Sequence, residues 1–322
     1  MKAAVYDETG SPDVLRYEDV PDPTAGPGDL LVRVEAIGIE GGDTLNRLGG
    51  ALRTRPHIVG YQCAGTVLEV GPEVTGFSAG DRVVTVGLDG SHAEQRAVPA
   101  AFAWAIPEVL GTPEAACVPV PFGTAHDCLF EFGRLTAGET VLIHAGASGV
   151  GIAAIQLAKR AGARVLATAS SDEKLARLGE LGLDHGINYA RTDFVAESRA
   201  LTDGRGVDVV VDSVGATTLQ GSLAALAYRG RCVSVGDAGR APAETLDISG
   251  MRPNNQTFSG YFLGAELLLA PRAHAMITRL LADIAEGRLR VVIDRAYPLR
   301  QAAAAHAYIE SRQSFGRVLL VP

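Results

Sequence analysis

The 322-residue sequence has no long apolar run, which bears on where the protein works. No run reaches the roughly 18–20 residues that a membrane-spanning helix needs. The N-terminal stretch MKAAVYDETG also lacks the apolar segment of a secretory leader. We therefore expect a cytoplasmic protein with no membrane partner.

Cysteine is scarce, and negative charge exceeds positive charge. The four cysteines, at positions 63, 117, 128 and 232, lie far apart without a CxxC pair. This spacing argues against a zinc ribbon and against a disulfide framework. The formal net charge of -8 argues against nucleic acid as a partner, because phosphates attract basic surfaces.

Groups of metal-binding residues are also missing. The seven histidines show no HxxxH pattern, and no cluster of nitrogen, sulfur and oxygen ligands is apparent. Zinc needs three or four converging ligands of these kinds. The sequence therefore predicts no metal site.

Two kinds of pattern divide the chain. Within residues 1–120, short runs at 30–39, 63–71 and 81–87 have the alternation or β-branched content of strands and are separated by Gly, Pro and Asp. They predict a small, strongly bent antiparallel barrel. Beyond residue 121, short apolar strands alternate with helical patterns, which is typical of a parallel sheet covered on both faces. The expected strands lie at 141–146, 164–170, 186–190, 207–215 and 230–237, the expected helices at about 150–161, 172–181, 193–202 and 217–228, and a later helix at 272–289 precedes a closing strand.

A glycine-rich turn follows the strand at 141–146. Gly146, Ser148, Gly149 and Gly151 have the spacing of a dinucleotide fingerprint, with serine in place of the middle glycine. Such a turn brings backbone N–H groups close to a pyrophosphate, where any Cβ would interfere, and the next helix adds free N–H donors. The hydroxyl of Ser148 can donate to a phosphate. Strand, turn, helix and second strand fall within about 30 residues, so the sequence predicts a dinucleotide site.

The end of the second strand distinguishes NADP from NAD. NAD sites usually place an acid there to hold the ribose 2′-hydroxyl, whereas this chain has Ser170. A small hydroxyl residue leaves room for a 2′-phosphate, and Lys174 is placed to pair with it. Asp172 or Glu173 remains an alternative as the ribose acid, although both also suit a helix start capped by Ser171. We expect NADPH rather than NADH.

The chain resembles the zinc-free quinone oxidoreductases (zeta-crystallin-like) of the medium-chain dehydrogenase/reductase superfamily. The similarity runs almost from end to end, and its long matches include MKAAVYDETGSPDVLRYEDVPDP, VLIHAGASGVG, VDVVVDSVG and YPLRQAAAAHAYIESRQSFGRVLLVP. The resemblance implies a GroES-like bent β barrel (1–120 and 264–322), an inserted Rossmann domain (121–263) and an active site in the cleft between them. It also implies a homodimer and NADPH-dependent, zinc-independent hydride transfer to a quinone or an α,β-unsaturated carbonyl such as an enone or alkenal.

The resemblance implies a set of cofactor contacts. Residues 148–150 would meet the pyrophosphate, the residues near 170 and 189 the 2′-phosphate and adenosine, and those near 235 and 261 the nicotinamide. The full set is Thr124, Gly146, Ser148, Gly149, Val150, Gly151, Ser170, Lys174, Tyr189, Ser213, Val235, Gly236, Tyr261, Leu263 and Arg312.

The stretch GIEGGDTL (38–45) departs from the family pattern Gly-Ile-Asn-Phe-x-Asp-x-Tyr. Glu40 replaces the asparagine, Gly41 the aromatic residue and Leu45 the tyrosine, so a wider pocket with an added carboxylate is expected. The resemblance places these residues and Tyr261 at the substrate. Glu40 either recognises a cationic or hydroxylated substrate or pairs with an arginine such as Arg47 or Arg53. The zinc-dependent relatives carry Cys and Gly-His-Glu ligands, and this chain has neither the Cys nor the His-Glu pair, which is Tyr61-Gln62 here.

The proton donor and the exact substrate stay open from sequence. Asp43, Tyr61 and His126 are the catalytic candidates; Asp43 alternatively caps a helix, His126 alternatively lies on a helix surface, and Tyr261 or water could also donate. One alternative activity is reduction of an enoyl thioester or a double bond of a specialised metabolite, with a basic channel from Arg47, Arg53 and Arg55. Another alternative is a non-catalytic NADPH-binding protein.

Overall fold

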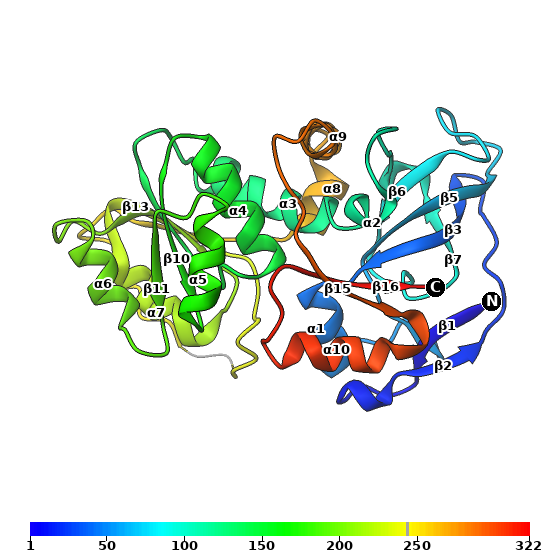
Figure 1. The fold of residues 1–322 in the computed structure, drawn as a ribbon, viewed down its shortest axis with the longest axis horizontal. Helices are drawn as coiled ribbons and strands as arrows, with labels where there is room; N and C mark the ends of the chain where they lie inside the picture. Colours follow the sequence, from blue (N-terminus) through cyan, green and yellow to red (C-terminus); the bar gives the residue numbers. More distant parts are fainter. Residues whose placement is uncertain (243–244) are drawn as a thin grey trace. The chain divides into compact units, whose positions relative to one another are not determined.

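The computed structural model describes residues 1–242 and 245–322, and the chain divides into two compact units (Figure 1). Unit 1 comprises Met1–Gly123 and Gly264–Pro322, and unit 2 comprises Thr124–Leu263. The chain enters unit 2 within helix α3 (Pro119–His126) and leaves it at the start of α8 (Leu263–Leu269). Unit 2 is therefore an insertion in the chain of unit 1.

Unit 1 is built on two β-sheets. The larger has the order β15-β16-β3-β5-β6-β8, with β7 also paired to β3, and the smaller has the order β2-β1-β4. Register breaks between Leu31 and Val32 and between Val34 and Ala36 interrupt the pairing of β3 with β5, and such bulges bend a strand. This is the expected GroES-like fold. The strands are β1 (Lys2–Tyr6), β2 (Arg16–Asp19), β3 (Asp29–Gly38), β4 (His57–Ile58), β5 (Gln62–Val70), β6 (Arg82–Val86), β7 (Gln95–Pro99), β8 (Ala103–Ala105), β15 (Ile293–Pro298) and β16 (Arg317–Val321).

The strands of unit 1 enclose an aliphatic core because their alternate residues point inward. Leu30 and Val32 of β3 pack with Val67, Val83 and Val98 from neighbouring strands. The helices of the unit are α1 (Gly41–Gly49), α2 (Thr112–Ala115), α9 (Arg272–Ala285) and α10 (Ala302–Glu310), with short 3-10 turns at Pro12–Val14, Ala100–Phe102 and Leu299–Gln301.

Unit 2 contains a parallel sheet with the order β11-β10-β9-β12-β13-β14 among its described residues. The chain starts at the middle strand β9, steps outward to β10 and β11, and then crosses to β12. This is the doubly wound Rossmann order, which confirms the predicted fold class. The strands are β9 (Thr140–Ile143), β10 (Arg164–Ala169), β11 (His185–Asn188), β12 (Val207–Asp212), β13 (Leu226–Ser234) and β14 (Thr257–Gly260), and the helices are α4 (Gly149–Arg160), α5 (Asp172–Gly179), α6 (Phe194–Ala200), α7 (Ala216–Ala225) and a π-helical segment at Asp127–Phe132.

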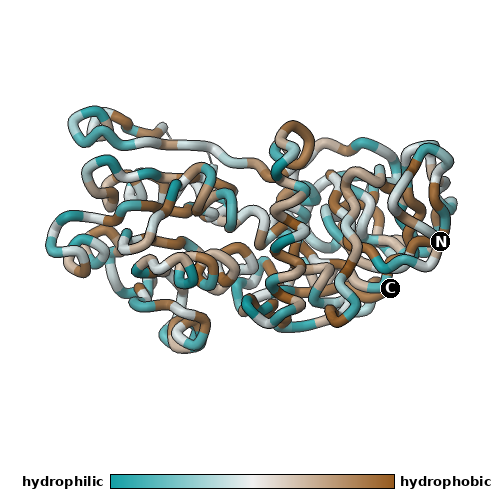
Figure 2. The backbone as a smooth tube through the Cα atoms, turned by 90° about the horizontal axis from the view of Figure 1, so that it is seen from above, coloured by the Kyte–Doolittle hydropathy of each residue, from teal (hydrophilic) through white to brown (hydrophobic). Residues whose placement is uncertain are grey.

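Buried apolar strands and polar turns organise unit 2. Leu142, Leu166 and Val210 lie in one buried cluster at the centre of the sheet, while Figure 2 shows hydrophilic residues at the outer turns. Several boundaries differ from expectation; for example, the helix expected to about 228 ends at Ala225, and β13 starts at Leu226. Leu226 pairs with Val207 and is buried in the same cluster, so tertiary packing converts the last helical turn into strand.

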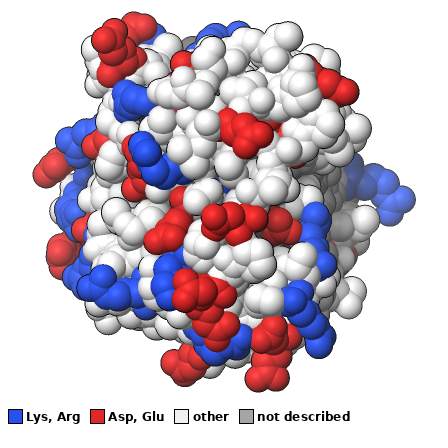
Figure 3. All heavy atoms as spheres, turned by 90° about the vertical axis from the view of Figure 1, so that its right-hand side faces the viewer, with Lys and Arg blue, Asp and Glu red and all other residues white. Residues whose placement is uncertain are grey.

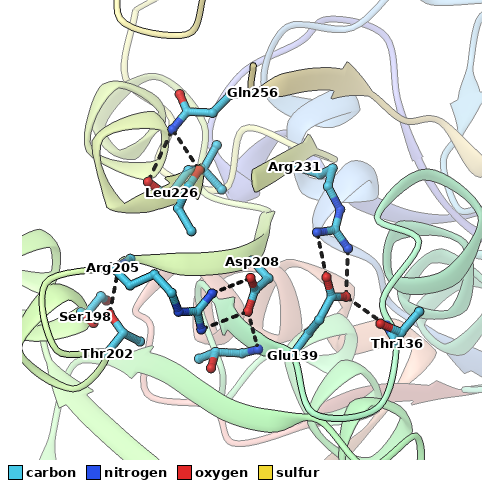
Figure 4. Close-up of polar contacts among 12 residues, drawn as sticks. Thr136, Glu139, Ser198, Thr202, Arg205, Asp208, Leu226, Arg231 and Gln256 are labelled. Atoms are coloured by element: carbon cyan, nitrogen blue, oxygen red, sulfur yellow. Dashed lines mark hydrogen bonds and ion pairs between the residues drawn. The ribbon is translucent and has the colours of Figure 1, made fainter. Parts of the chain in front are cut away.

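The starts of the parallel strands are held by ion pairs and amides (Figure 4). Arg231 of β13 donates to both carboxylate oxygens of Glu139, at 2.9 and 2.8 Å. Asp208 at the start of β12 binds the guanidinium of Arg205 and accepts the N–H of Thr140 at 2.8 Å. A polar hollow opens at this amino edge, but its acidic groups are engaged in these pairs.

The surface carries charges of both signs. Acidic and basic side chains are interspersed on the face drawn in Figure 3, and unit 1 has exposed ion pairs such as Arg16 with Asp7. Within the described residues, no helix combines the length and the apolar character required to cross a membrane.

Candidate active site

The glycine turn lies where β9 meets α4 in unit 2. Ser148 is the N-cap of α4, and its hydroxyl oxygen accepts the N–H of Gly151 at 3.0 Å. The first N–H groups of a helix have no intrahelical acceptor, so those of Gly149 and Val150 are available to a ligand. Together with the helix dipole they form a site for an anion.

The turn requires glycine because other backbone lies against it. A Cβ on Gly151 would come within 2.4 Å of the carbonyl oxygen of Ala145, and one on Gly146 would lie 3.0 Å from the Cβ of Ala167. The backbone of the turn is thus packed closely against neighbouring residues, and the N–H groups at the start of α4 face outward. The geometry of these residues suits the diphosphate of a dinucleotide, and their contact with it stays a prediction.

The other expected contacts in unit 2 follow the ends of the parallel strands. Because these ends form one edge of the sheet, residues far apart in sequence come to the same side as the glycine turn. They are Ser170 after β10, Tyr189 after β11, Ser213 after β12, Val235 and Gly236 after β13, and Tyr261 after β14.

The residues that follow β10 favour a phosphate over a ribose hydroxyl. Ser171 caps α5 by accepting the N–H of Lys174 at 3.3 Å. Asp172 accepts a hydrogen bond from the Asn188 amide at 2.8 Å and pairs with Arg191. The amide bond, aided by Arg191, lowers the pKa of Asp172. Of the two acids considered for the 2′-hydroxyl, Asp172 is therefore engaged by Asn188 of β11 and by Arg191.

A buried network that the sequence reasoning missed supports this edge. One oxygen of Asp212 accepts the N–H groups of Val214 and Gly215 at 2.9 and 3.0 Å, which shapes the turn after β12. The other oxygen accepts the hydroxyl of Ser222 at 2.7 Å, and Ser222 lies 3.0 Å from His144 Nε2. All three side chains of the network are buried, and burial lowers the pKa of His144.

In unit 1 the added carboxylate has a different partner from those expected. Glu40 is only 4% exposed and pairs with Arg317 of β16, whose Nη1 lies 3.0 Å from Glu40 Oε2. The Gln62 amide also donates to Glu40. Burial raises the pKa of Glu40, and the charge of Arg317 opposes this rise. Glu40 thus forms an ion pair, as one of the two expectations had it, but its partner is Arg317, whereas Arg47 and Arg53 pair with Glu310 and Asp89.

Asp43 accepts backbone hydrogen bonds next to the Glu40–Arg317 pair. Its two oxygens accept the N–H groups of Glu40 and Tyr61 at 2.8 and 3.1 Å, so it caps α1 and fixes the segment before β5. It is fully buried, and burial raises its pKa to about 8. Of the two expected roles, helix capping is the one that these contacts describe.

Tyr61 packs on α1 through a glycine. A Cβ on Gly42 would come within 2.4 Å of the Tyr61 ring, and the Tyr61 hydroxyl accepts a hydrogen bond from the Asn46 amide at 3.1 Å. Gly41 faces open space instead. Leu45 lies partly buried on the same helix. Burial raises the pKa of Tyr61, which keeps its hydroxyl protonated.

The arginines considered for a basic channel are engaged elsewhere. Arg47 is fully buried and pairs with Glu310, and Arg53 pairs with Asp89 at 3.5 Å. Arg312 follows α10 in unit 1 with a left-handed backbone at φ 58. Arg47 is thus fixed in the interior of unit 1, whereas Arg53 holds an exposed surface pair.

The remaining candidate acids meet at a carboxylate in unit 2. His126 ends α3, and its Nδ1 lies 3.1 Å from one oxygen of Asp127. The Tyr261 hydroxyl donates to the other oxygen at 3.1 Å. Asp127 is fully buried and begins the π-helical segment, while His126 is 28% exposed. Thr124 and Leu263 are both buried within the same unit.

Comparisons with known proteins agree with this arrangement. Residues 26–108 match a family described as the alcohol dehydrogenase GroES-like domain, and residues 149–283 match one described as zinc-binding dehydrogenase. A 2-haloacrylate reductase from Burkholderia sp is 34% identical over 100% of this chain and 99% of its own. The chain belongs to the zinc-independent quinone oxidoreductase family of the medium-chain dehydrogenases/reductases.

Solved structures of this quinone oxidoreductase family superimpose closely. A Pseudomonas syringae quinone oxidoreductase has a TM-score of 0.95 and 33% identity, with 100% of this chain and 99% of that chain covered. The Escherichia coli quinone oxidoreductase complexed with NADPH has a TM-score of 0.95 and 29% identity over 100% of both chains.

Unit 1 differs from the zinc-dependent relatives at the positions of their zinc ligands. The positions at which zinc-dependent relatives carry ligands lie in the stretches of Glu40 and Tyr61, and here a salt bridge and a glycine-packed ring occupy them. Across the described ranges, no group of three or more His, Cys, Asp or Glu side chains is placed to hold a metal ion. The residues present do not fit a zinc ion.

Proposed function

We propose that the protein reduces a conjugated carbonyl compound, either a quinone or an enone, with NADPH. The observation that carries the proposal is the glycine turn of unit 2, with its free N–H groups at Gly149 and Val150 and a serine, not an acid, after β10. The protein is an NADPH-dependent oxidoreductase, like the family to which it belongs. Bound NADPH supplies hydride, and the protein binds and orients both partners.

The cofactor residues divide by the part of NADPH that they would hold. The N–H groups at the start of α4 suit the diphosphate, and Ser170 with Lys174 suits the 2′-phosphate. From the diphosphate, the nicotinamide would extend in the opposite direction, over the ends of β12, β13 and β14. Ser213, Val235, Gly236 and Tyr261 lie there, on turns that Asp212 helps to shape.

The substrate class follows from the electronic demand of hydride transfer. A quinone and a 2-haloacrylate both present an electron-poor carbon conjugated to a carbonyl group. Gly41 and Leu45 replace larger side chains of the family pattern, so we propose that the protein accepts a bulkier enone than a simple quinone. Glu40 is sequestered by Arg317 and is not proposed to contact the substrate.

The experiment measures NADPH consumption against a panel of quinones, alkenals, cyclic enones, 2-haloacrylates and enoyl-CoA esters, with NADH in parallel. We expect turnover with enones or quinones and a higher kcat/KM for NADPH than for NADH. Turnover confined to enoyl-CoA would instead identify an enoyl-thioester reductase. Binding of NADPH without turnover of any substrate would identify a non-catalytic protein.

A matched pair of variants tests the cofactor site itself. Gly151→Ala places a methyl group against the Ala145 carbonyl, so it should weaken NADPH binding by on the order of tenfold or more. Gly179→Ala is the control, because a Cβ there meets nothing within 4 Å. Binding is read from the fluorescence of the reduced nicotinamide. Equal affinities of the two variants would contradict the site.

We also propose that two copies of the chain pair through β14, in the cytoplasm. β14 ends the sheet order of unit 2, so one side of it offers unpaired N–H and C=O groups. Tyr228, Phe258 and Phe262 near this edge are 64%, 36% and 56% exposed. All four cysteines are free, as is usual in a reducing compartment.

Sedimentation velocity of the wild type and of Phe258→Lys tests the pairing. A lysine on an edge strand opposes edge-to-edge association, so the variant should sediment as a monomer while the wild type sediments as a dimer. Leu268→Lys, at another exposed apolar residue in unit 1, is the control and should leave the dimer intact. A monomeric wild type would contradict the pairing.

A further inference from the structure

The Tyr261–Asp127–His126 cluster lies in the half of the sheet that would receive the nicotinamide. Ser170 and Lys174 follow β10, whereas Tyr261 follows β14 at the far end of the strand order. In a doubly wound sheet the dinucleotide spans the carboxyl edge with its diphosphate at the first helix. The cluster is therefore on the side of the reacting ring and away from the adenosine.

The buried Asp127 carboxylate needs hydrogen-bond donors around it. It is fully buried, at the first residue of a π-helical segment closed by the bond from the Gly133 N–H to the Cys128 carbonyl at 3.0 Å. Burying a carboxylate is unfavourable unless donors surround it. His126 and Tyr261 supply such donors, and Tyr261 is itself held by the Phe132 ring at 5.2 Å.

The hydrogen bonds decide which side chain of the cluster can donate outward. A tyrosine has one hydroxyl hydrogen, and that of Tyr261 is directed to Asp127. A carboxylate only accepts, so His126 must carry hydrogen on Nδ1, which leaves Nε2 for an outside partner. His126 is also the exposed member, at 28%.

We propose that His126 is the proton donor of the reduction, with Asp127 and Tyr261 as positioning residues. This assignment rests on the proposed function. The assignment adds to that function by selecting one acid among the candidates and by giving a role to Asp127, which the sequence analysis did not single out. Asp43 does not compete, because both of its oxygens are engaged by backbone N–H groups in the interior of unit 1.

The proton transfer completes a balanced reduction. Bound NADPH would supply the hydride by giving up a C–H bond of its reduced ring and becoming NADP⁺; the β-carbon would gain the new C–H bond, and the π electron pair of the double bond would move toward the carbonyl oxygen. The proton on His126 Nε2 passes to the α-carbon or to that oxygen, and its N–H electron pair stays on the ring. The ring is then neutral, and its Nδ1–H stays hydrogen-bonded to Asp127. Nε2 takes up a new proton from solvent on the exposed side of the ring.

Quinones and enones should respond differently to loss of this acid. Hydride addition to a quinone leaves a phenolate-type anion, which is stable in water and needs no protein acid. Hydride addition to an enone leaves a far more basic enolate, whose protonation is part of the barrier. General-acid catalysis typically contributes on the order of 10²–10⁴-fold, so the two substrates separate the role of His126 from cofactor binding.

The experiment compares His126→Gln, Asp127→Asn, Tyr261→Phe and Tyr61→Phe in the full-length protein. We expect His126→Gln to lower kcat for an enone by about 10²-fold while kcat for a quinone changes by less than about threefold. Asp127→Asn should give a smaller loss in the same direction, with a larger solvent isotope effect. His185→Gln, an exposed histidine of β11, is the control and should leave both rates unchanged.

Two measurements do not depend on activity. Ring ¹⁵N shifts of His126 should show hydrogen on Nδ1 in the wild type and a changed tautomer balance in Asp127→Asn. Fluorescence titration should show unchanged NADPH affinity in His126→Gln. A variant that fails to fold is recognised by circular dichroism, and the ¹⁵N shifts of the wild type then still test the assigned hydrogen bond.

The outcomes separate this proposal from the proposed function. Full enone activity in His126→Gln, or a selective loss of enone activity in Tyr61→Phe instead, would overturn the assignment to His126 while leaving an NADPH-dependent reductase. A wild type that consumes NADPH with no quinone and no enone would overturn the proposed function and this proposal together. A wild-type ring that carries hydrogen on Nε2 but none on Nδ1 would overturn the role of Asp127 alone.

Discussion

The two units differ in the kind of polar group at their candidate sites. Unit 2 offers backbone: the N–H groups of Gly149 and Val150 stand free at a helix start, behind a turn packed too tightly for a side chain at Gly151. Unit 1 offers buried charge, with the carboxylates of Glu40 and Asp43 closed in by Arg317 and by backbone donors. A backbone site depends on local geometry, whereas a charge cluster depends on distant partners.

The difference predicts how each unit fails. A substitution in unit 2 that blocks the turn should remove a ligand and spare the fold, because the turn is at the edge of a complete sheet. A substitution in unit 1 that removes one charge should destabilise the fold itself, because the other charge stays buried. The predictions below test this contrast.

The largest effect is expected from Arg317→Met. The variant leaves the Glu40 carboxylate buried without its cation, although Gln62 still donates to it, and loss of one partner of a buried pair costs about 3–5 kcal/mol in the free energy of unfolding. Urea denaturation followed by circular dichroism measures it. Glu40→Gln combined with Arg317→Met should recover part of the loss, because no unpaired charge remains.

An exposed pair in the same unit provides the control. Arg16 pairs with Glu18 at 2.6 Å, and both side chains are more than two-fifths exposed. Arg16→Met should therefore leave the urea midpoint almost unchanged. Equal losses for Arg16→Met and Arg317→Met would remove the distinction between buried and exposed charge.

A pH dependence is expected from Asp43. Burial raises its pKa to about 8 from an ordinary value of 3.8, so between these values the folded state keeps a proton that the unfolded state has released. The folded state is thus favoured at low pH, and this contribution is lost as the pH rises toward about 8. Between pH 5 and pH 7 the wild type should lose about 1–3 kcal/mol relative to Asp43→Asn.

Urea midpoints of both proteins at the two pH values measure this difference. Asp43→Asn keeps an oxygen that can accept one of the two backbone N–H groups, so it should still fold. Parallel pH profiles for the two proteins would show that Asp43 is ionised in the folded state.

The site of unit 2 could be predicted from sequence because its determinants are adjacent. Gly146, Ser148 and Gly151 span six residues, and Ser170 is fixed by the end of the next strand. Strand, turn and helix obey short-range preferences, and a parallel order brings all strand ends to one edge. The sequence therefore predicted the Rossmann fold correctly and placed its candidate cofactor residues along one edge of the sheet, where their contacts with NADPH stay a prediction.

The charge cluster of unit 1 could not be predicted because its members are remote. Glu40 and Arg317 are 277 positions apart, and no local pattern links them. The sequence offered Arg47 and Arg53 as nearer partners, but both are engaged elsewhere. Asp127 was missed for a related reason, since its partner Tyr261 lies 134 positions away. The sequence named the candidate donors His126 and Tyr261, but nothing in it linked them to Asp127.

A moderate effect is expected from Lys174→Ala in unit 2. Loss of one charge-assisted contact to the 2′-phosphate should raise the KM for NADPH by about tenfold and leave the KM for NADH unchanged. Lys159→Ala removes a lysine of α4 that pairs with Asp184 instead, and serves as the control. A parallel rise in both KM values for Lys174→Ala would show that the residue supports the fold rather than the phosphate.

The smallest effect is expected for the four cysteines, which should not react with a thiol reagent in the native protein. All are buried and free, two in each unit. Burial raises the pKa of Cys117 to about 11 and raises those of Cys128 and Cys232 as well, so little thiolate exists at pH 8. The native protein should therefore release no colour from Ellman's reagent at pH 8, whereas the urea-unfolded protein should react at all four.

The same reagent compares the two units during partial unfolding. Cys63 and Cys117 report on unit 1, and Cys128 and Cys232 report on unit 2. In Arg317→Met the thiols of unit 1 should become reactive at a lower urea concentration than those of unit 2, because the unpaired charge is in unit 1. Mass spectrometry of the labelled peptides distinguishes them. Simultaneous exposure of all four would mean that the two units unfold as one, and that the buried pair stabilises both.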